Sequence, residues 1–593
     1  MRTGPRGPEA GLAVCAIIVA VAIVTGLAGQ LAALTSGHGW PRWHGIGWEL
    51  LRPLAGVYLH AADPMRNWPG LPPTITVPAV MYWICFAVVI GAAMTLAVVT
   101  VRVVVGRRSR PGFARRRDVA ARLGTTALVK QAPRLRPALA RTTSRPRAEQ
   151  LGTRLGRDVH TGIDCWSSVR QSKYVVGPSE SGKTSAVVIP EALDHDGPLL
   201  APSSRADVMA ATWRSRSERG RVLLFDPLRT APGLPLLRWD LVWACTDPAV
   251  AMRRAQDLMA SVDMTGVSNG DAWKNRGQAV LRNLLHAAAL DHRDIRTVLR
   301  WAYDQTSVEP AAILDRGGVT PGNWAEMQYS VIQTPERQRA GYYMAVEGAL
   351  EPFMHPAVLE TCLPGAGQQF DPVSFLDPTG GQQTIYMIAQ VDQAVAVTDL
   401  LGALMDEIIE LARAAAQRSE NNRLDPPLKF LVDEAPNTAT LKQLPSLISD
   451  GGGRGIPTTM VVQDRHQAAR RWGRDDAASM WGAATIRQVL PGVAGEDEMR
   501  EIAAYFGEFD EEVPSVTRGA QGHSEQISVR TRAAMTPADV RSIASFHSLV
   551  IAAGGLRPIE TELVPYFRRP DAGLTARAER DFYTALNEGR TVL

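Results

Sequence analysis

One segment of the chain indicates its architecture: Gly177-Pro178-Ser179-Glu180-Ser181-Gly182-Lys183-Thr184. The run 173–176 before this segment is short and largely apolar, as in a buried strand, and the run 185–189 after it suits the start of a buried helix. A strand, a glycine-bounded loop that ends in Lys-Thr, and then a helix are the context of a phosphate-binding P-loop. The segment therefore predicts a nucleotide site on an α/β fold.

Each part of this loop has a chemical task. Gly177 and Gly182 let the backbone turn so that its N–H groups point inward around an anion, and the helix N-terminus adds its positive dipole end. The Lys183 ammonium can reach the β- and γ-phosphates, and the Thr184 hydroxyl can bind Mg²⁺. We therefore expect all eight residues from Gly177 to Thr184 to form the nucleotide-binding loop.

A pair of carboxylates follows another apolar run. Residues 428–432 read as a buried strand, and Asp433 and Glu434 come directly after it. At the carboxyl end of a strand such a pair can serve as a Walker B site, in which Asp433 holds Mg²⁺ through water and Glu434 polarises the attacking water. Asp-Glu alone is a weak signal, but an upstream P-loop makes it specific.

Two further residues are candidates for catalysis. Gln463 ends the strand predicted over 458–462, where a polar side chain can sense the γ-phosphate. Arg454 lies in the glycine-rich stretch 451–455 and can project into a neighbouring subunit's site as an arginine finger. The alternative for this stretch is a helix stop with Arg454 as an ordinary surface residue.

Strand and helix patterns alternate through most of the body, which predicts an α/β fold with a mostly parallel sheet. Residues 152–240 form the first part of the predicted nucleotide-binding domain and 376–567 the second. Between them, 241–375 show helical periodicity and little strand signal, and we interpret them as an all-α insert domain. Residues 568–593 are mixed and charged, and we expect a frayed or partner-binding tail.

Two apolar runs precede the body, within a predicted membrane domain that spans 1–105. Residues 11–34 and 77–101 are each long enough to cross a bilayer as a helix. Basic residues flank the outer sides of the pair, and the loop between the runs holds Trp40, Trp43, Trp48 and Trp68. This distribution predicts two transmembrane helices with the loop outside and the body in the cytoplasm. The alternative for the first run is a cleaved signal peptide.

Charge is concentrated after the second run, although the net charge of the whole chain is only +4. From Arg102 to Arg147 there are fourteen Lys or Arg residues and one acid, Asp118. We interpret 106–151 as a basic juxtamembrane linker that touches anionic lipid, in preference to a contact for nucleic-acid backbone. The five cysteines show no zinc spacing, which favours a reducing compartment without a disulfide framework.

Together these features resemble the coupling proteins of type IV secretion and conjugation systems, the TraG/TraD-like family. The resemblance is carried by the two N-terminal apolar runs and by five stretches: GPSESGKT, SSRADVMAATWRSRSERGRVLLFDP, DAWKNRGQAVLRNLL, FLVDEAPN and GGGRGI…MVVQDRHQAARRWG. It covers most of 152–567. The family often has Thr where this chain has Ser179, a departure that leaves the phosphate cradle intact.

The resemblance implies a RecA-like P-loop ATPase that uses ATP and Mg²⁺ and forms a ring, expected to be a hexamer, at the bacterial inner membrane. Such a protein recruits single-stranded DNA with its relaxase, or protein substrates, and drives them toward the channel proteins of a type IV secretion system. By motif, Lys183 and Thr184 match Walker A, Asp433 and Glu434 match Walker B, Gln463 matches the sensor and Arg454 the trans finger. The main alternative is an FtsK-like double-stranded DNA translocase.

Overall fold

The computed structural model of the chain describes residues 7–593 except 42–56, 58, 67, 69, 73, 106–110, 143–144, 232, 317–319, 390–396, 439–440 and 520–521. Two residues named above, Trp43 and Trp48, lie outside this description, as do Arg2, Arg6, Arg107, Arg108 and Arg110 among the basic residues that flank the two apolar runs. The chain divides into two compact units, Met1–Arg108 and Ser109–Leu593.

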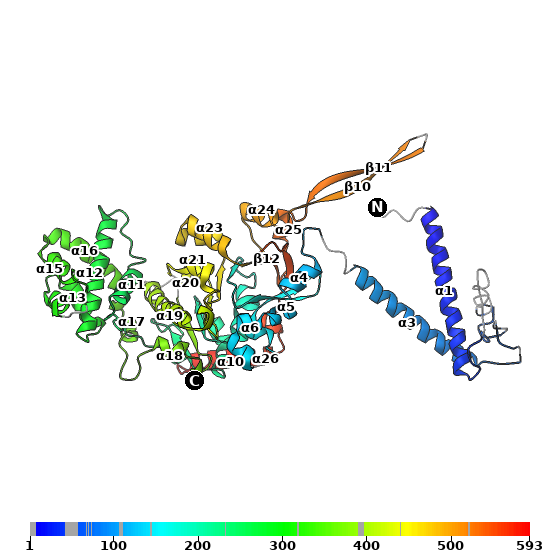
Figure 1. The fold of residues 1–593 in the computed structure, drawn as a ribbon, viewed down its shortest axis with the longest axis horizontal. Coiled ribbons are helices and arrows are strands. Elements are labelled where there is room, and N and C mark those ends of the chain that lie inside the picture. Colours follow the sequence, from blue (N-terminus) through cyan, green and yellow to red (C-terminus); the bar gives the residue numbers. More distant parts are fainter. Residues whose placement is uncertain are drawn as a thin grey trace. The chain divides into compact units, whose positions relative to one another are not determined.

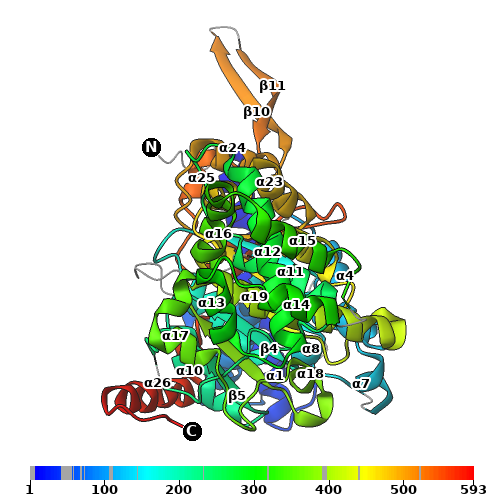
Figure 2. The same cartoon turned by 90° about the vertical axis from the view of Figure 1, so that its left-hand side faces the viewer.

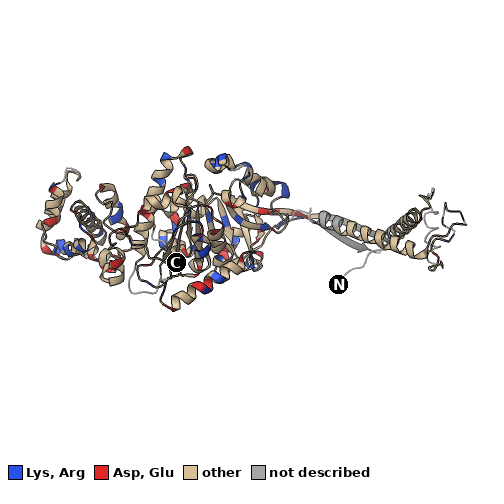
Figure 3. Cartoon of the chain, turned by 90° about the horizontal axis from the view of Figure 1, so that it is seen from below, with Lys and Arg blue, Asp and Glu red and all other residues tan. Residues whose placement is uncertain are grey.

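The first unit is built on two long apolar helices, α1 (Gly7–Thr35) and α3 (Ala79–Val105). Spans within them, Ile18–Thr35 and Ala79–Val98, are long and apolar enough to cross a membrane. Both helices are drawn almost without charged residues in Figure 3. They pack on each other through a small cluster that includes Ala28, Trp68 and Tyr82, and a side chain at Gly29 would collide with the Trp68 indole.

An eleven-stranded sheet organises the described part of the second unit, in the order β2-β1-β13-β12-β9-β3-β8-β7-β4-β6-β5. From β9 to β5 all neighbouring strands are parallel, whereas β12, β13, β1 and β2 add an antiparallel extension. The parallel strands are β3 (Lys173–Val176), β4 (Leu199–Ser203), β5 (Val222–Phe225), β6 (Thr384–Ile388), β7 (Lys429–Val432), β8 (Thr458–Val462) and β9 (Ile486–Val489). The predicted α/β class with a mostly parallel sheet is confirmed.

Three strands of the antiparallel extension were not predicted: β1 (Gly152–Asp158), β2 (Asp164–Ser168) and β13 (Ile559–Glu562). The fourth strand of the extension is β12 (His547–Ala552). Strand β1 contains a single large apolar residue, Leu155, so it lacks the pattern of a buried strand. It forms because two strands pair with its edges: β2, which is close in sequence, and β13, which is distant.

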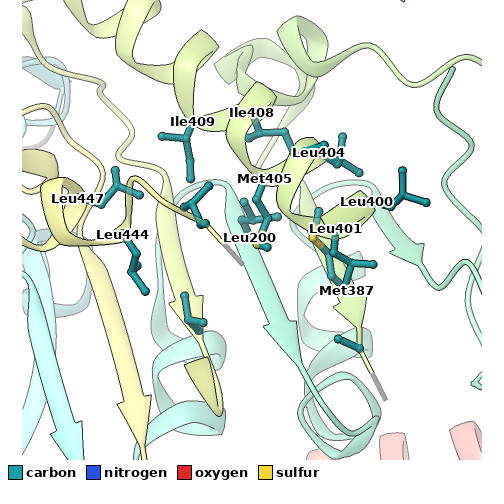
Figure 4. Packing of buried hydrophobic residues seen from close by; sticks show 14 of the residues in the cluster. Leu200, Met387, Leu400, Leu401, Leu404, Met405, Ile408, Ile409, Leu444 and Leu447 are labelled. Atoms are coloured by element: carbon teal, nitrogen blue, oxygen red, sulfur yellow. The ribbon is translucent and has the colours of Figure 1, made fainter. Parts of the chain in front are cut away.

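The parallel strands are buried on both faces, which explains their nearly continuous apolar sequences. Tyr174 and Val176 of β3 join one buried cluster, and Val175 joins the other. The first cluster includes α19 (Thr398–Arg418), whose Leu404, Met405 and Ile408 lie over the sheet in Figure 4. The second includes α9 (Ile189–Asp194), α10 (Asp207–Ser217) and α26 (Ala572–Asn587). Helices therefore cover both sides of the sheet.

Between β5 and β6 the described chain from 248 to 376 is helical and gathers into the bundle that faces the viewer in Figure 2. Asp247 caps the first helix, because its carboxylate accepts from the Ala249 N–H. The helices are α11 (Pro248–Leu258), α12 (Gly270–Leu290), α13 (Ile295–Tyr303), α14 (Glu309–Arg316), α15 (Trp324–Gln333), α16 (Glu336–Leu350), α17 (Pro356–Thr361) and α18 (Pro372–Leu376).

The basic segment after α3 differs from the expected linker. Its described part forms short helices: α4 (Arg116–Arg122), α5 (Thr125–Lys130), α6 (Ala132–Leu135), α7 (Pro137–Thr142) and α8 (Ala148–Leu151). Leu128, Leu135 and Leu151 pack with Trp166 of β2 in a cluster of their own. Arg136 is buried and forms ion pairs with Asp196 and Asp425. The apolar residues of this segment are spaced irregularly along the sequence, so no helical or strand period indicated that they pack together.

The C-terminal residues also differ from expectation. Helix α26 packs on α10, where the Trp213 indole N–H donates to the Ala578 carbonyl and Phe582 is fully buried. The expected frayed tail is therefore wrong for 572–587, because the helix has an apolar face that α10 covers. Before it in the chain, β10 (Glu508–Gly519) and β11 (Gly522–Ala533) form a two-stranded hairpin (Figure 1).

The remaining short helices are α20 (Ala435–Thr438), α21 (Leu444–Ser446), α22 (Arg465–Trp472), α23 (Arg474–Ala483), α24 (Glu496–Ala504) and α25 (Pro537–Arg541). Helices α20 and α22 directly follow β7 and β8. The side chains that end these two strands therefore meet at the same edge of the sheet as the P-loop, which follows β3.

Candidate nucleotide site

The loop after β3 has the shape of an anion cradle. Glu180 and Gly182 adopt left-handed conformations, with φ of 64° and 89°. A β-carbon at Gly177 would lie 2.5 Å from Ser181 Oγ and 2.8 Å from Leu490 Cβ, so only glycine fits there. After the loop the chain enters a π-helical turn, Lys183–Val188, which continues into α9. Alternation between left- and right-handed residues turns successive N–H groups toward one point, as anion binding requires.

Lys183 spans this loop. Its side chain is buried, at 7% exposure, and Nζ donates to the Pro178 carbonyl at 2.7 Å. Burial lowers the pKa of the ammonium, while the nearby Asp433 and Glu434 raise it. The Nζ atom thus contacts the backbone of the loop itself, where a phosphate oxygen can replace the Pro178 carbonyl as its partner.

Asp433 ends β7 beside the loop. Its Oδ2 accepts from Thr184 Oγ1 at 3.2 Å, whereas Oδ1 is buried and has no hydrogen-bond partner among the described residues. Burial, and then the charges of Asp207 and Glu434, raise the pKa of this carboxyl to about 6. A hydroxyl beside a buried carboxylate oxygen without a partner fits Mg²⁺, which takes few protein ligands and keeps several waters.

Glu434 is held from both sides. Its backbone is left-handed, with φ of 51°, a strained conformation for a side chain of this size. Oε1 accepts from Gln463 Nε2 at 3.1 Å, and Oε2 accepts from Ser204 Oγ. Gln463 in turn accepts from Gln467 Nε2 at 3.4 Å. The carboxylate is therefore fixed next to the phosphate cradle, between the ends of β4 and β8.

Ser204 was not identified from the sequence. It follows β4, the neighbour of β7 in the sheet, and it is separated from Glu434 by 230 positions along the chain. Serine after an apolar strand is too common to mark a site. The strand order would have indicated it, because a polar residue at the end of the strand next to a Walker B strand must face that site.

Arg454 lies away from these groups. It precedes β8 whereas Gln463 follows it, so the two side chains belong to opposite ends of the same strand. Its guanidinium pairs with Asp450 at 3.0 Å, and both side chains are partly exposed. The chain therefore does not bring Arg454 to its own P-loop, and an interaction with phosphate would need a second subunit.

Comparison with known proteins indicates a family that acts in DNA transfer. The family model described as "Type IV secretory system Conjugative DNA transfer" matches residues 160–589. No curated protein sequence matches the chain.

Among solved structures, the chain is similar to the unbound monoclinic form of the bacterial conjugative coupling protein TrwBdeltaN70. The match has 16% identity and a TM-score of 0.53, and it covers 73% of this chain and 93% of that one. The plasmid coupling protein TrwB in complex with a non-hydrolysable ATP analogue matches at 15% identity and a TM-score of 0.50, over 67% of this chain and 86% of that one. TrwB in complex with ADP and Mg²⁺ matches at the same identity and TM-score, over 72% and 92%. At these identities the likeness shows a shared fold.

Proposed function

The chain belongs to the type IV secretory system conjugative DNA-transfer family, and we propose that it is a membrane-anchored ATPase. In this role it couples hydrolysis of MgATP to the delivery of DNA into a type IV secretion channel. The observation that carries the proposal is the convergence of Lys183, Thr184, Asp433 and Glu434 at the ends of β3 and β7.

The geometry supports a division of labour at this site. Lys183 and the loop N–H groups hold the β- and γ-phosphates, and Thr184 and Asp433 hold Mg²⁺. When bound, Mg²⁺ neutralises charge on the phosphate oxygens. Glu434, fixed by Ser204 and Gln463, orients the attacking water and accepts a hydrogen bond from it, which polarises the O–H bond of that water. The structures of TrwB with an ATP analogue and with ADP and Mg²⁺ support these ligands for this chain.

The proposal also includes the partners of the protein and its location in the cell. Helices α1 and α3 serve as two spans in the bacterial inner membrane, with the ATPase body in the cytoplasm. The cargo is single-stranded DNA with its relaxase, and the acceptors are the channel proteins of the secretion system. The body assembles as a homo-oligomer, a hexameric ring in which Arg454 reaches the γ-phosphate of the next subunit and stabilises charge in the transition state.

The test is ATP hydrolysis by the full-length protein in detergent, without DNA and with single- or double-stranded DNA. We expect turnover that single-stranded DNA stimulates. Lys183→Ala should lose nucleotide binding, whereas Glu434→Gln should bind ATP and fail to hydrolyse it. Near-normal turnover by the Glu434 variant would remove this residue from the role. Stimulation by double-stranded DNA alone would favour the FtsK-like translocase.

Arg454 has its own test. Arg454→Ala should reduce turnover by about 10³-fold or more with little effect on ATP affinity. Mixing this variant with Lys183→Ala protein should restore some activity, because mixed interfaces contain complete sites. Normal turnover by Arg454→Ala alone would exclude the trans-finger role.

A further inference from the structure

An aromatic cluster lies directly beside the P-loop. The Phe546 ring approaches Gly182 so closely that a β-carbon there would be 3.4 Å from it. The Phe567 ring packs edge-on against Phe546, with centroids 5.9 Å apart. The Arg568 guanidinium lies over both rings, 5.0 Å from the Phe546 centroid and 6.0 Å from that of Phe567. We call these three residues the aromatic shelf.

The position of the shelf is maintained against backbone strain. Phe546 has a φ of 59°, which is a true outlier for a bulky aromatic residue. Such conformations persist where the surroundings over-determine them, and they gather at ligand clamps. Here the conformation places the ring against the loop residue that immediately precedes Lys183.

The shelf is open on its outer side. Phe567 is 50% exposed, so one side of its ring is accessible next to the buried loop residues. Arg568 is exposed, and its guanidinium contacts the Phe546 and Phe567 rings. An exposed aromatic ring and an exposed guanidinium plane are groups on which nucleobases stack.

The position of the phosphates limits where the base of a bound nucleotide can lie. If the loop from Gly177 to Thr184 holds the triphosphate, the sugar and base must leave along a side of the loop. At Gly177 the loop is closed by Leu490, and at Pro178 by Gly492. On the Gly182 side the first group is the aromatic shelf, whose outer face is exposed.

We propose that the aromatic shelf of Phe546, Phe567 and Arg568 binds the base of the nucleotide. This assignment rests on the function proposed above, and it adds the source of base affinity at that site. The base stacks on Phe567 and Arg568, while Phe546 supports both and fixes their distance from the P-loop.

The experiment compares two ligands of the full-length protein in detergent, MgATP and magnesium tripolyphosphate, which has no sugar or base. Dissociation constants are measured by displacement of a fluorescent ATP analogue. Phe567→Ala should weaken MgATP by about fivefold to a hundredfold, the range for one base–aromatic stack, and leave tripolyphosphate unchanged. Phe567→Trp should retain MgATP affinity. Tyr303→Ala, at an equally exposed aromatic on α13, is the matched control and should change neither constant.

Every outcome decides the proposal. Unchanged MgATP affinity in Phe567→Ala, or equal losses for both ligands, would overturn it. So would a wild-type protein that binds MgATP no more tightly than tripolyphosphate, since the base would then contribute nothing. If the wild type binds neither ligand, the proposed ATPase function is wrong, and so is the role of the aromatic shelf that rests on it. An Arg568→Ala variant, which alters no buried group, repeats the test independently of Phe567.

Discussion

Replacement of Arg136 by alanine should release the basic segment 116–151 from the body. Arg136 lies between α6 and α7, and its side chain is only 8% exposed. Nε contacts Asp425 Oδ1 at 2.6 Å, and one terminal nitrogen contacts Asp196 Oδ2 at 3.0 Å and the Gln150 carbonyl at 3.1 Å. The variant would leave two largely buried carboxylates without this partner.

The magnitude follows from that burial. Breaking a buried ion pair by removing one partner costs about 3–5 kcal/mol, because the remaining charge is uncompensated. Arg141 provides a control in the same segment. It pairs with Glu420 at 2.8 Å, but the two side chains are 66% and 55% exposed, so its loss should cost about 1 kcal/mol or less.

Amide hydrogen exchange of the full-length protein measures this difference locally. The segment has its own apolar cluster and can open without unfolding the sheet. At about 1.4 kcal/mol per factor of ten, Arg136→Ala should speed exchange in α5 and α6 by about a hundredfold to several thousandfold, as long as the segment stays more stable than that loss. Arg141→Ala should change it by about fivefold or less.

The reasoning would be refuted if the two variants exchanged alike in these helices. It would also fail if Arg136→Ala accelerated exchange equally throughout the parallel sheet, because the ion pairs would then stabilise the whole body and not the segment.

Four further results are expected. Ser204→Ala should lower turnover by about tenfold to a hundredfold at nearly constant KM for ATP, because the Glu434 carboxylate loses one hydrogen bond to a charged group; unchanged turnover would show that Gln463 positions it alone. Because burial raises the pKa of Asp433 to about 6, the proton competes with Mg²⁺ below that pH, so Mg²⁺ affinity measured by calorimetry should fall from pH 7.5 to 5.5, and a flat profile would contradict it. Leu404→Ala on α19 should destabilise the fully buried core by about 2–5 kcal/mol in chemical denaturation, and a loss below 1 kcal/mol would mean that the site collapses around the cavity. Reporter fusions after residue 60 should report the outside and those after residue 120 the cytoplasm, and the reverse would refute the two-span topology.

Some of this protein could be read from residues that are adjacent in the chain. The P-loop is one, because a phosphate is held by consecutive N–H groups and by a lysine at a set distance from them. The strand before Asp433 is another, since a parallel strand buried on both faces needs a continuous apolar run. The α/β class and the Walker residues follow from such local requirements.

What the tertiary structure decided depends on contacts between distant segments. Ser204 meets Glu434 only because β4 lies next to β7, an order that no local pattern encodes. Phe546 reaches Gly182 through the antiparallel extension of the sheet, and α26 is ordered by the face of α10 that it covers. In the sequence Arg136 is one of many basic residues of a linker, whereas in the structure it is buried and paired with Asp196 and Asp425. In each case the role of the side chain is set by its neighbours in space, and these come from distant parts of the chain through strand order or helix packing.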